Sequence, residues 1–278
     1  MGERSASVSV SEAVSSMLAV PRIGRTVFVG TFAMLAATLM PESLGLLASV
    51  ILITLTGYQV TLARHVAFDY PLPPAFAGQL GAMLRRGISV GMIVGVPPFL
   101  LVAGLLFLAR PPVPEALGAL ASSVAWAALI LSLLVLIPLS VVAFGSRYLF
   151  FDRFREGFHY LDALGRFRRF WRQGLVVAAV PAAWTLISLS VRNLVGRAIG
   201  ISNLRDAGKT AWDLATGHFS AAGAVSIIVQ LVLTALGFAV ILVCAHLLGQ
   251  YTRLAYVPDE ALPQSVEQAH QHDCQQVD

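Results

Sequence analysis

The chain has 278 residues, of which 57% are hydrophobic and 12% are charged, and its formal net charge is +4. Soluble domains carry about 25% charged residues, so a water-soluble fold of this length could not bury so much apolar surface. The arginines adjoin apolar runs and do not form a basic face with interleaved aromatics, which argues against nucleic-acid binding and favours anionic lipid headgroups as a partner.

The N-terminal residues 1–20 lack the basic start, apolar centre and cleavage site of a secretory signal, so we expect them to remain as a cytoplasmic segment. Two apolar runs of about twenty residues follow, which is the length that crosses a bilayer. They predict spans at 23–40 and 44–63, joined by a tight turn at Pro41-Glu42-Ser43. One long tilted helix is the alternative, and it would reverse the parity of every later span.

Four further uncharged runs, each bracketed by charged residues, predict four more transmembrane helices. We expect them at 88–109, 119–145, 174–192 and 222–248. The sequence thus predicts an all-α polytopic transmembrane helical bundle over 21–256. The tail 257–278 carries five acidic residues and no basic one, and we expect it to be disordered.

Six spans place both ends of the chain on one side of the membrane, and the basic residues indicate which side. The N-terminal segment, the even-numbered connections and the tail hold fourteen of the nineteen basic residues, and the opposite face holds five. Basic residues accumulate in cytoplasmic connections. The sequence therefore predicts a multi-pass protein of the cell membrane with both termini cytoplasmic.

The connection 149–172 carries aromatic and leucine side chains at intervals of three and four residues, with arginines on its other faces. This spacing predicts an interfacial amphipathic helix between spans four and five, with Gly165 as a candidate break. Such a helix would anchor the bundle at the headgroup level, and docking of a partner is the alternative. The arginines expected to contact lipid headgroups are Arg155, Arg166, Arg168, Arg169 and Arg172.

Small residues recur every four positions at the start of the third span. Gly87, Gly91 and Gly95 form a ridge that would let another helix backbone approach closely. Packing within this chain is the simplest interpretation. A contact between two copies of the chain is the alternative, and one sequence does not separate them.

Three spans carry a proline at similar depth. Pro97, Pro138 and Pro181 would each lie about 14–17 Å from the cytoplasmic boundary at about 1.5 Å per residue. Interrupted helices at one level are typical of transporters, although a coupled transporter usually carries a charged side chain there and these spans do not. We interpret the prolines as helix breaks that serve packing and keep a transport pathway as the alternative.

Motifs for catalysis and metal binding are missing from the sequence, including HExxH, GxSxG and a phosphate-binding glycine loop. An enzyme acting on lipid would need Asp152, His159 and Asp162, but charge balance with neighbouring arginines explains the aspartates. The histidines of the tail and Cys274 lack a fourth ligand at suitable spacing for zinc. We therefore predict no enzyme activity, no cofactor and no metal.

Several short motifs in the predicted membrane domain also occur together in one known family. They are Leu55-Thr56-Gly57-Tyr58, Arg64, Pro71-Leu72-Pro73-Pro74, Arg86-Gly87, the segment 154–170 and Ala245-His246-Leu247-Leu248-Gly249-Gln250-Tyr251. In this order they resemble the bacterial and archaeal membrane family called domain of unknown function 4013, over about residues 20–256. The resemblance implies a polytopic helical membrane protein without established activity, and it transfers no site residue.

The absence of catalytic groups, together with an aromatic and basic surface helix, predicts a non-catalytic structural or assembly partner of a membrane complex. Its partners would be membrane lipids and a membrane protein or a second copy of the chain. A transporter or exporter of a small or lipidic solute is the alternative function.

Overall fold

The computed structural model describes residues 8–21, 23–40, 42–70, 72, 79–108, 132–198 and 221–257. Every regular element within these ranges is helical. Four helices of the described part are long and apolar enough to cross a membrane. They are α3 (Gly45–Ala67), the helix Leu134–Phe151, α9 (Trp171–Ala198) and Ile227–Tyr256 of α11 (Ala221–Tyr256). The predicted all-α membrane class is therefore confirmed.

Helix α1 (Val10–Ala19) precedes α2 (Ile23–Leu39), and the two would form a fifth span if the bent pair counts as one, although they meet at 102°. Ser9 begins α1, because its hydroxyl accepts a hydrogen bond from the Glu12 amide at 3.3 Å. Ala13 and Met17 are buried, and the Ser9 amide donates to Gln250 Oε1 at 3.1 Å. The expected N-terminal segment thus includes a helix that packs against α11.

The first two expected spans are separate helices. Helix α2 ends at Leu39, a 3-10 turn follows at Glu42–Leu44 (η1), and α3 continues from Gly45 to Ala67. The alternative of one long helix is therefore excluded. Proline disfavours helical backbone in the residue before it, which explains a break next to Pro41.

Helix α4 (Leu80–Leu108) covers the expected span 88–109 but begins eight residues earlier, so Arg85 and Arg86 are helical. The described part of the expected fourth span 119–145 begins at residue 132, and residues 119–131 lie outside the described ranges. It alternates between π-helix (η2, Ser132–Leu136, and η3, Val141–Gly145) and α-helix (α6, Ile137–Ser140, and α7, Ser146–Phe151).

The last two expected spans, 174–192 and 222–248, lie within the longer helices α9 and α11. Arginine ends an apolar run, but it is a good helix former, so the helices extend past the charges that bracket the runs. The expected acidic tail lies outside the described residues apart from Val257.

The expected amphipathic helix over 149–172 is instead divided into shorter elements. Helix α7 ends at Phe151, a 3-10 helix (η4) runs from Phe154 to Phe158, and α8 (Tyr160–Arg169) precedes α9. Asp152 adopts the left-handed conformation, with φ at 49°, which ends α7. Gly165 lies inside α8 and does not break it.

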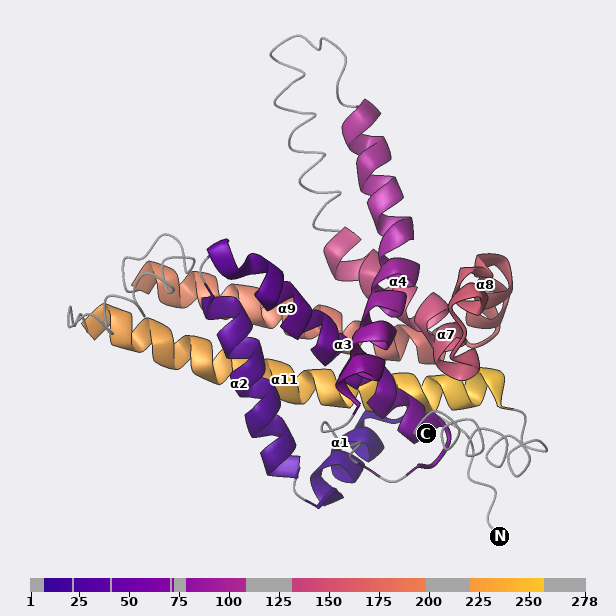
Figure 1. Cartoon of the computed structure of the whole chain (residues 1–278), viewed down its shortest axis with the longest axis horizontal. Helices are drawn as coiled ribbons and strands as arrows, with labels where there is room; N and C mark the ends of the chain where they lie inside the picture. Colours follow the sequence, from indigo (N-terminus) through magenta and orange to yellow (C-terminus); the bar gives the residue numbers. More distant parts are fainter. Residues whose placement is uncertain are drawn as a thin grey trace.

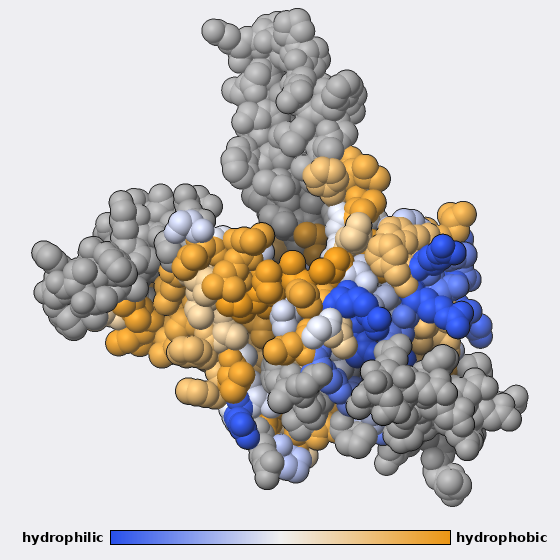
Figure 2. Space-filling model, in the orientation of Figure 1, coloured by the Kyte–Doolittle hydropathy of each residue, from blue (hydrophilic) through white to orange (hydrophobic). Residues whose placement is uncertain are grey.

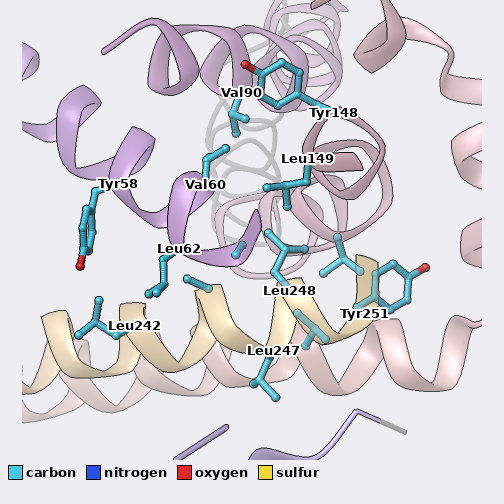
Figure 3. Close-up of a cluster of buried hydrophobic side chains, with 14 of the residues drawn as sticks. Tyr58, Val60, Leu62, Val90, Tyr148, Leu149, Leu242, Leu247, Leu248 and Tyr251 are labelled. Atoms are coloured by element: carbon cyan, nitrogen blue, oxygen red, sulfur yellow. The ribbon is translucent and has the colours of Figure 1, made fainter. Parts of the chain in front are cut away.

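The end of α11 lies at one end of the molecule, beside α7 and α8 (Figure 1). Helix α3 is in contact with both α4 and α11. Tyr58 and Leu62 of α3 point toward α11, where Leu242 lies, and Leu149 extends from α7 into the same cluster (Figure 3). These four side chains are at most 2% exposed, so a dry apolar core supports this end.

Candidate functional site

A group of six ionisable side chains, which we call the charged cluster, joins five elements at this end of the molecule. Its members are Arg64, Arg86, Arg147, Asp152, Glu156 and Asp162, from α3, α4, α7, the residue after α7, η4 and α8. The three arginines are only 6 to 7% exposed. Figure 2 shows hydrophilic residues gathered near α7 and α8, whereas hydrophobic residues dominate the rest of the described surface in view.

Asp152 forms the first half of the charged cluster by pairing with two arginines from different helices. Arg64 at the end of α3 pairs with its Oδ2, and Arg86 Nη2 at the start of α4 donates to the same oxygen at 3.0 Å. Arg86 Nη1 also donates to Thr61 Oγ1 at 3.3 Å. The left-handed backbone of Asp152 turns the chain immediately after α7 and so brings its carboxylate to both arginines.

Arg147 forms the second half. Its Nε donates to the Glu156 carbonyl oxygen at 2.9 Å and its Nη2 to Glu156 Oε2 at 2.8 Å, while Nη1 pairs with Asp162. The guanidinium also lies over the Phe151 ring, 5.0 Å from its centroid. Arg147 thus fixes η4 and α8 against the end of α7.

The electrostatics of the charged cluster are balanced, because three arginines face three carboxylates. Burial opposes ionisation of Asp152, but the charges of Arg64 and Arg86 and their hydrogen bonds outweigh that effect, so the pKa of Asp152 is lowered below its ordinary value. Asp152 is consequently an anion at neutral pH. A carboxylate held this way is a poor proton acceptor, which makes general-base chemistry at this site unfavourable.

Close approaches of α3 to α4 and to α11 support the charged cluster. A Cβ atom added to Gly57 would overlap the Met83 carbonyl, and one added to Gly87 would overlap the Ile53 carbonyl, so the α3 and α4 backbones touch. A Cβ atom added to Gly249 would likewise overlap the Ala63 carbonyl, so α11 packs closely against α3. These contacts allow Arg64 and Arg86 to reach one carboxylate.

Of the expected ridge of Gly87, Gly91 and Gly95, Gly87 makes a close contact with a described residue. A Cβ atom at Gly91 or Gly95 would meet nothing within 4 Å in the described structure. The four-residue spacing located one glycine of the α3–α4 contact. It missed Gly57, which carries the matching close approach from α3.

The three expected helix breaks lie within helices. Pro97 is inside α4, Pro138 is in α6 between the two π-helical segments, and Pro181 is inside α9. Pro138 is buried and α6 packs against α9. The Pro181 carbonyl accepts a hydrogen bond from Thr185 Oγ1 at 2.8 Å.

Of the arginines expected to contact lipid, Arg166 turns toward the protein. Its Nη1 donates to the Ala255 carbonyl at 3.1 Å, and its guanidinium lies 4.6 Å from the Tyr256 ring centroid. The other four, Arg155, Arg168, Arg169 and Arg172, are exposed. Within the described part of the chain, none of these four forms an ion pair.

Two of the three residues considered for an enzyme, Asp152 and Asp162, belong to the charged cluster, and His159 does not. Asp152 and Asp162 are both occupied by arginines, whereas His159 is exposed and its amide donates to the Glu156 carbonyl at 3.3 Å. In the described ranges no three side chains of His, Cys, Asp or Glu are grouped so that they could hold a metal ion. Sequence reasoning assigned charge balance to the aspartates but did not identify the buried arginines that provide it.

No family model, curated protein or solved structure matches this chain. The resemblance to domain of unknown function 4013 therefore stays a prediction. Several of the residues on which it rests lie at the contact among α3, α4 and α11: Gly57, Tyr58, Arg64, Arg86, Gly87, Gly249 and Tyr251.

Proposed function

We propose that this chain is a non-catalytic structural or assembly subunit of a membrane complex, with six spans and both termini in the cytoplasm. The observation that carries the proposal is the charged cluster, in which every ionisable side chain is already paired with another. Catalytic and transport sites require polar groups that remain available to a substrate. Here the buried polar groups hold helix ends together.

The six-span topology has support from the positions of the helix ends. The arginine count assigns the end of α3, the start of α4, the end of α7 and the end of α11 to the cytoplasmic face. Ion pairs join these ends through Asp152, and Arg253 of α11 pairs with Asp69 beyond α3 at 2.6 Å. Helices α2 and α4 would supply the spans beyond the four that stand alone, since residues 87–108 of α4 carry no charge.

Two measurements test this proposal. Reporter fusions at the two termini should both indicate the cytoplasm, and fusions on opposite sides would contradict the topology. Chemical cross-linking in intact membranes, followed by purification in mild detergent, should recover the chain with a stoichiometric protein partner or a second copy. A strictly monomeric chain without a cross-linked partner would contradict the assembly function.

A transporter or exporter of a small or lipidic solute is the second candidate function, and the helix from Ser132 to Phe151 is the observation that favours it. Two π-helical segments flank Pro138, and π-helical turns are frequent at functional sites because they free backbone carbonyls. Uptake or efflux in proteoliposomes tests this candidate. Solute movement equal to that of protein-free vesicles would count against it.

A further inference from the structure

Helix α8 and the first turn of α9 present a surface that the charged cluster does not use. We call it the α8 surface, and it comprises Leu161, Leu164, Arg168, Arg169, Trp171 and Arg172. Leu161 is 88% exposed, Leu164 is 52% exposed and Trp171 is 48% exposed. The three arginines are exposed and form no ion pair with any described residue.

The apolar part of the α8 surface has no protein cover in the described structure, yet burying a leucine is favourable by about 1.5–3 kcal/mol. Helix α8 has ten residues, which is about 15 Å and too short to cross a bilayer. A short helix with exposed leucines beside arginines is suited to the boundary between headgroups and acyl chains. Tryptophan is enriched at the same boundary.

The position of α8 next to α9 determines how deep the α8 surface lies in the bilayer. Only Phe170 separates α8 from α9, a helix long and apolar enough to cross the membrane. The Phe167 ring lies where a Cβ atom of Gly174 would be, so α8 folds back onto the first turn of α9. The α8 surface therefore lies where α9 enters the bilayer.

The aromatic rings also shape how the arginines are presented. The Arg169 guanidinium lies 5.4 Å from the Phe170 ring centroid, and the Arg172 guanidinium lies 5.6 Å from that of Trp171. A ring face holds a guanidinium without neutralising its charge. Both arginines consequently keep donors for phosphate oxygens, which bind guanidinium groups through paired hydrogen bonds.

We propose that the α8 surface binds the anionic headgroups of phospholipids in the leaflet where α9 begins. The arginines bind the headgroup phosphates, and Leu161, Leu164 and Trp171 insert among the upper acyl chains. This inference rests on the proposed membrane placement. An acidic protein partner matches the charge alone, whereas a lipid matches both the charge and the apolar side chains at the entrance of a span.

The test uses the full chain in nanodiscs of phosphatidylcholine with a minority of phosphatidylglycerol. Brominated acyl chains quench tryptophan fluorescence on contact and are carried either by the phosphatidylglycerol or by an equal amount of the phosphatidylcholine. The signal of Trp171 is the difference between the chain and its Trp171→Phe variant. We expect brominated phosphatidylglycerol to quench Trp171 more strongly than brominated phosphatidylcholine.

Matched variants test whether the arginines cause the preference for phosphatidylglycerol. Replacing Arg168, Arg169 and Arg172 with glutamine should abolish the preference, since each basic residue near an anionic leaflet contributes about fivefold to binding that leaflet. Replacing the same three with lysine should retain most of the preference. Arg197→Gln, which removes an exposed arginine near the opposite end of α9, should leave the preference unchanged.

Equal quenching of Trp171 by the two brominated lipids in the unaltered chain would overturn the inference, whatever the variants do. Equal quenching together with loss of a cross-linked protein in the glutamine variant would assign the surface to a protein partner, and this also overturns it. A monomeric, partnerless chain that still prefers phosphatidylglycerol would contradict the assembly function and support the lipid site. The two failures are therefore distinguishable.

Discussion

Asp69 and Asp152 lie just beyond the ends of two helices, Asp69 two residues after α3 and Asp152 directly after α7. Each follows a helix in the left-handed conformation, with φ at 57° and 49°, and each pairs with arginine. The Asp69 side chain is 64% exposed and that of Asp152 is 16% exposed. An exposed pair contributes about 0–1 kcal/mol, whereas removing one partner of a buried pair costs about 3–5 kcal/mol. The two aspartates share a backbone conformation and an arginine partner, and we expect them to contribute different shares of the stability.

The largest expected effect tests this difference directly. Asp152→Asn keeps a residue that tolerates the left-handed conformation but leaves Arg64 and Arg86 buried without their carboxylate. We expect the free energy of unfolding to fall by about 3–5 kcal/mol, and by under about 1 kcal/mol for the matched Asp69→Asn. Unfolding by SDS in mixed micelles, followed by thiol labelling of Cys244 in a Cys274→Ser background, measures both. An equal loss of unfolding free energy in the two variants would refute the idea that burial makes Asp152 more important than Asp69.

A smaller effect is expected where the helices beneath the charged cluster approach closely. Gly87→Ala places a methyl group against the Ile53 carbonyl, and separating the α3 and α4 backbones should cost about 1–3 kcal/mol. Gly91→Ala, one turn away in open space, should be neutral or stabilise by up to about 1 kcal/mol because alanine favours helix. The same unfolding assay decides, and destabilisation by Gly91→Ala would indicate that the four-residue ridge packs as the sequence suggested.

Acid should reduce the stability that the ion pairs of Asp152 contribute, because protonation removes its charge. The folded-state pKa of Asp152 lies below its ordinary value of 3.8. Its contribution to stability is thus complete above about pH 4 and is lost as the pH falls through the folded-state pKa. We expect the SDS midpoint of the wild type to fall more steeply below about pH 4 than that of Asp152→Asn. Parallel midpoints would show that Asp152 is not the group that titrates.

The smallest stability effect is expected on the α8 surface. Changing Arg168, Arg169 and Arg172 to glutamine removes three positive charges but no described ion pair. The free energy of unfolding in neutral detergent should change by less than about 0.5 kcal/mol. Arg147→Gln, which removes the buried arginine that pairs with both Glu156 and Asp162, should cost several times more. A similar loss in both variants would contradict the separation between structural and surface arginines.

The helical class and most helix positions were predictable because uncharged runs of membrane length leave few alternatives. The helix ends were less predictable, since arginine ends an apolar run without ending a helix, as at the start of α4 and the end of α11. The charged cluster was not predictable because it joins residues far apart in the chain, with Arg86 and Asp152 separated by 66 positions. The close approach at Gly57 was not predictable for a related reason: spacing on one helix does not say where a second backbone lies.

The bend between α1 and α2 has a consequence for biogenesis. It returns α1 to the final helix, where the Ser9 amide binds Gln250, 241 residues later in the chain. Helix α1 therefore lacks its docking site until Gln250, 241 residues after Ser9, has been synthesised. The contact between α1 and α11 can thus form only after the helices between them have been synthesised, and a product truncated before α11 would leave the buried Ala13 and Met17 of α1 without that cover.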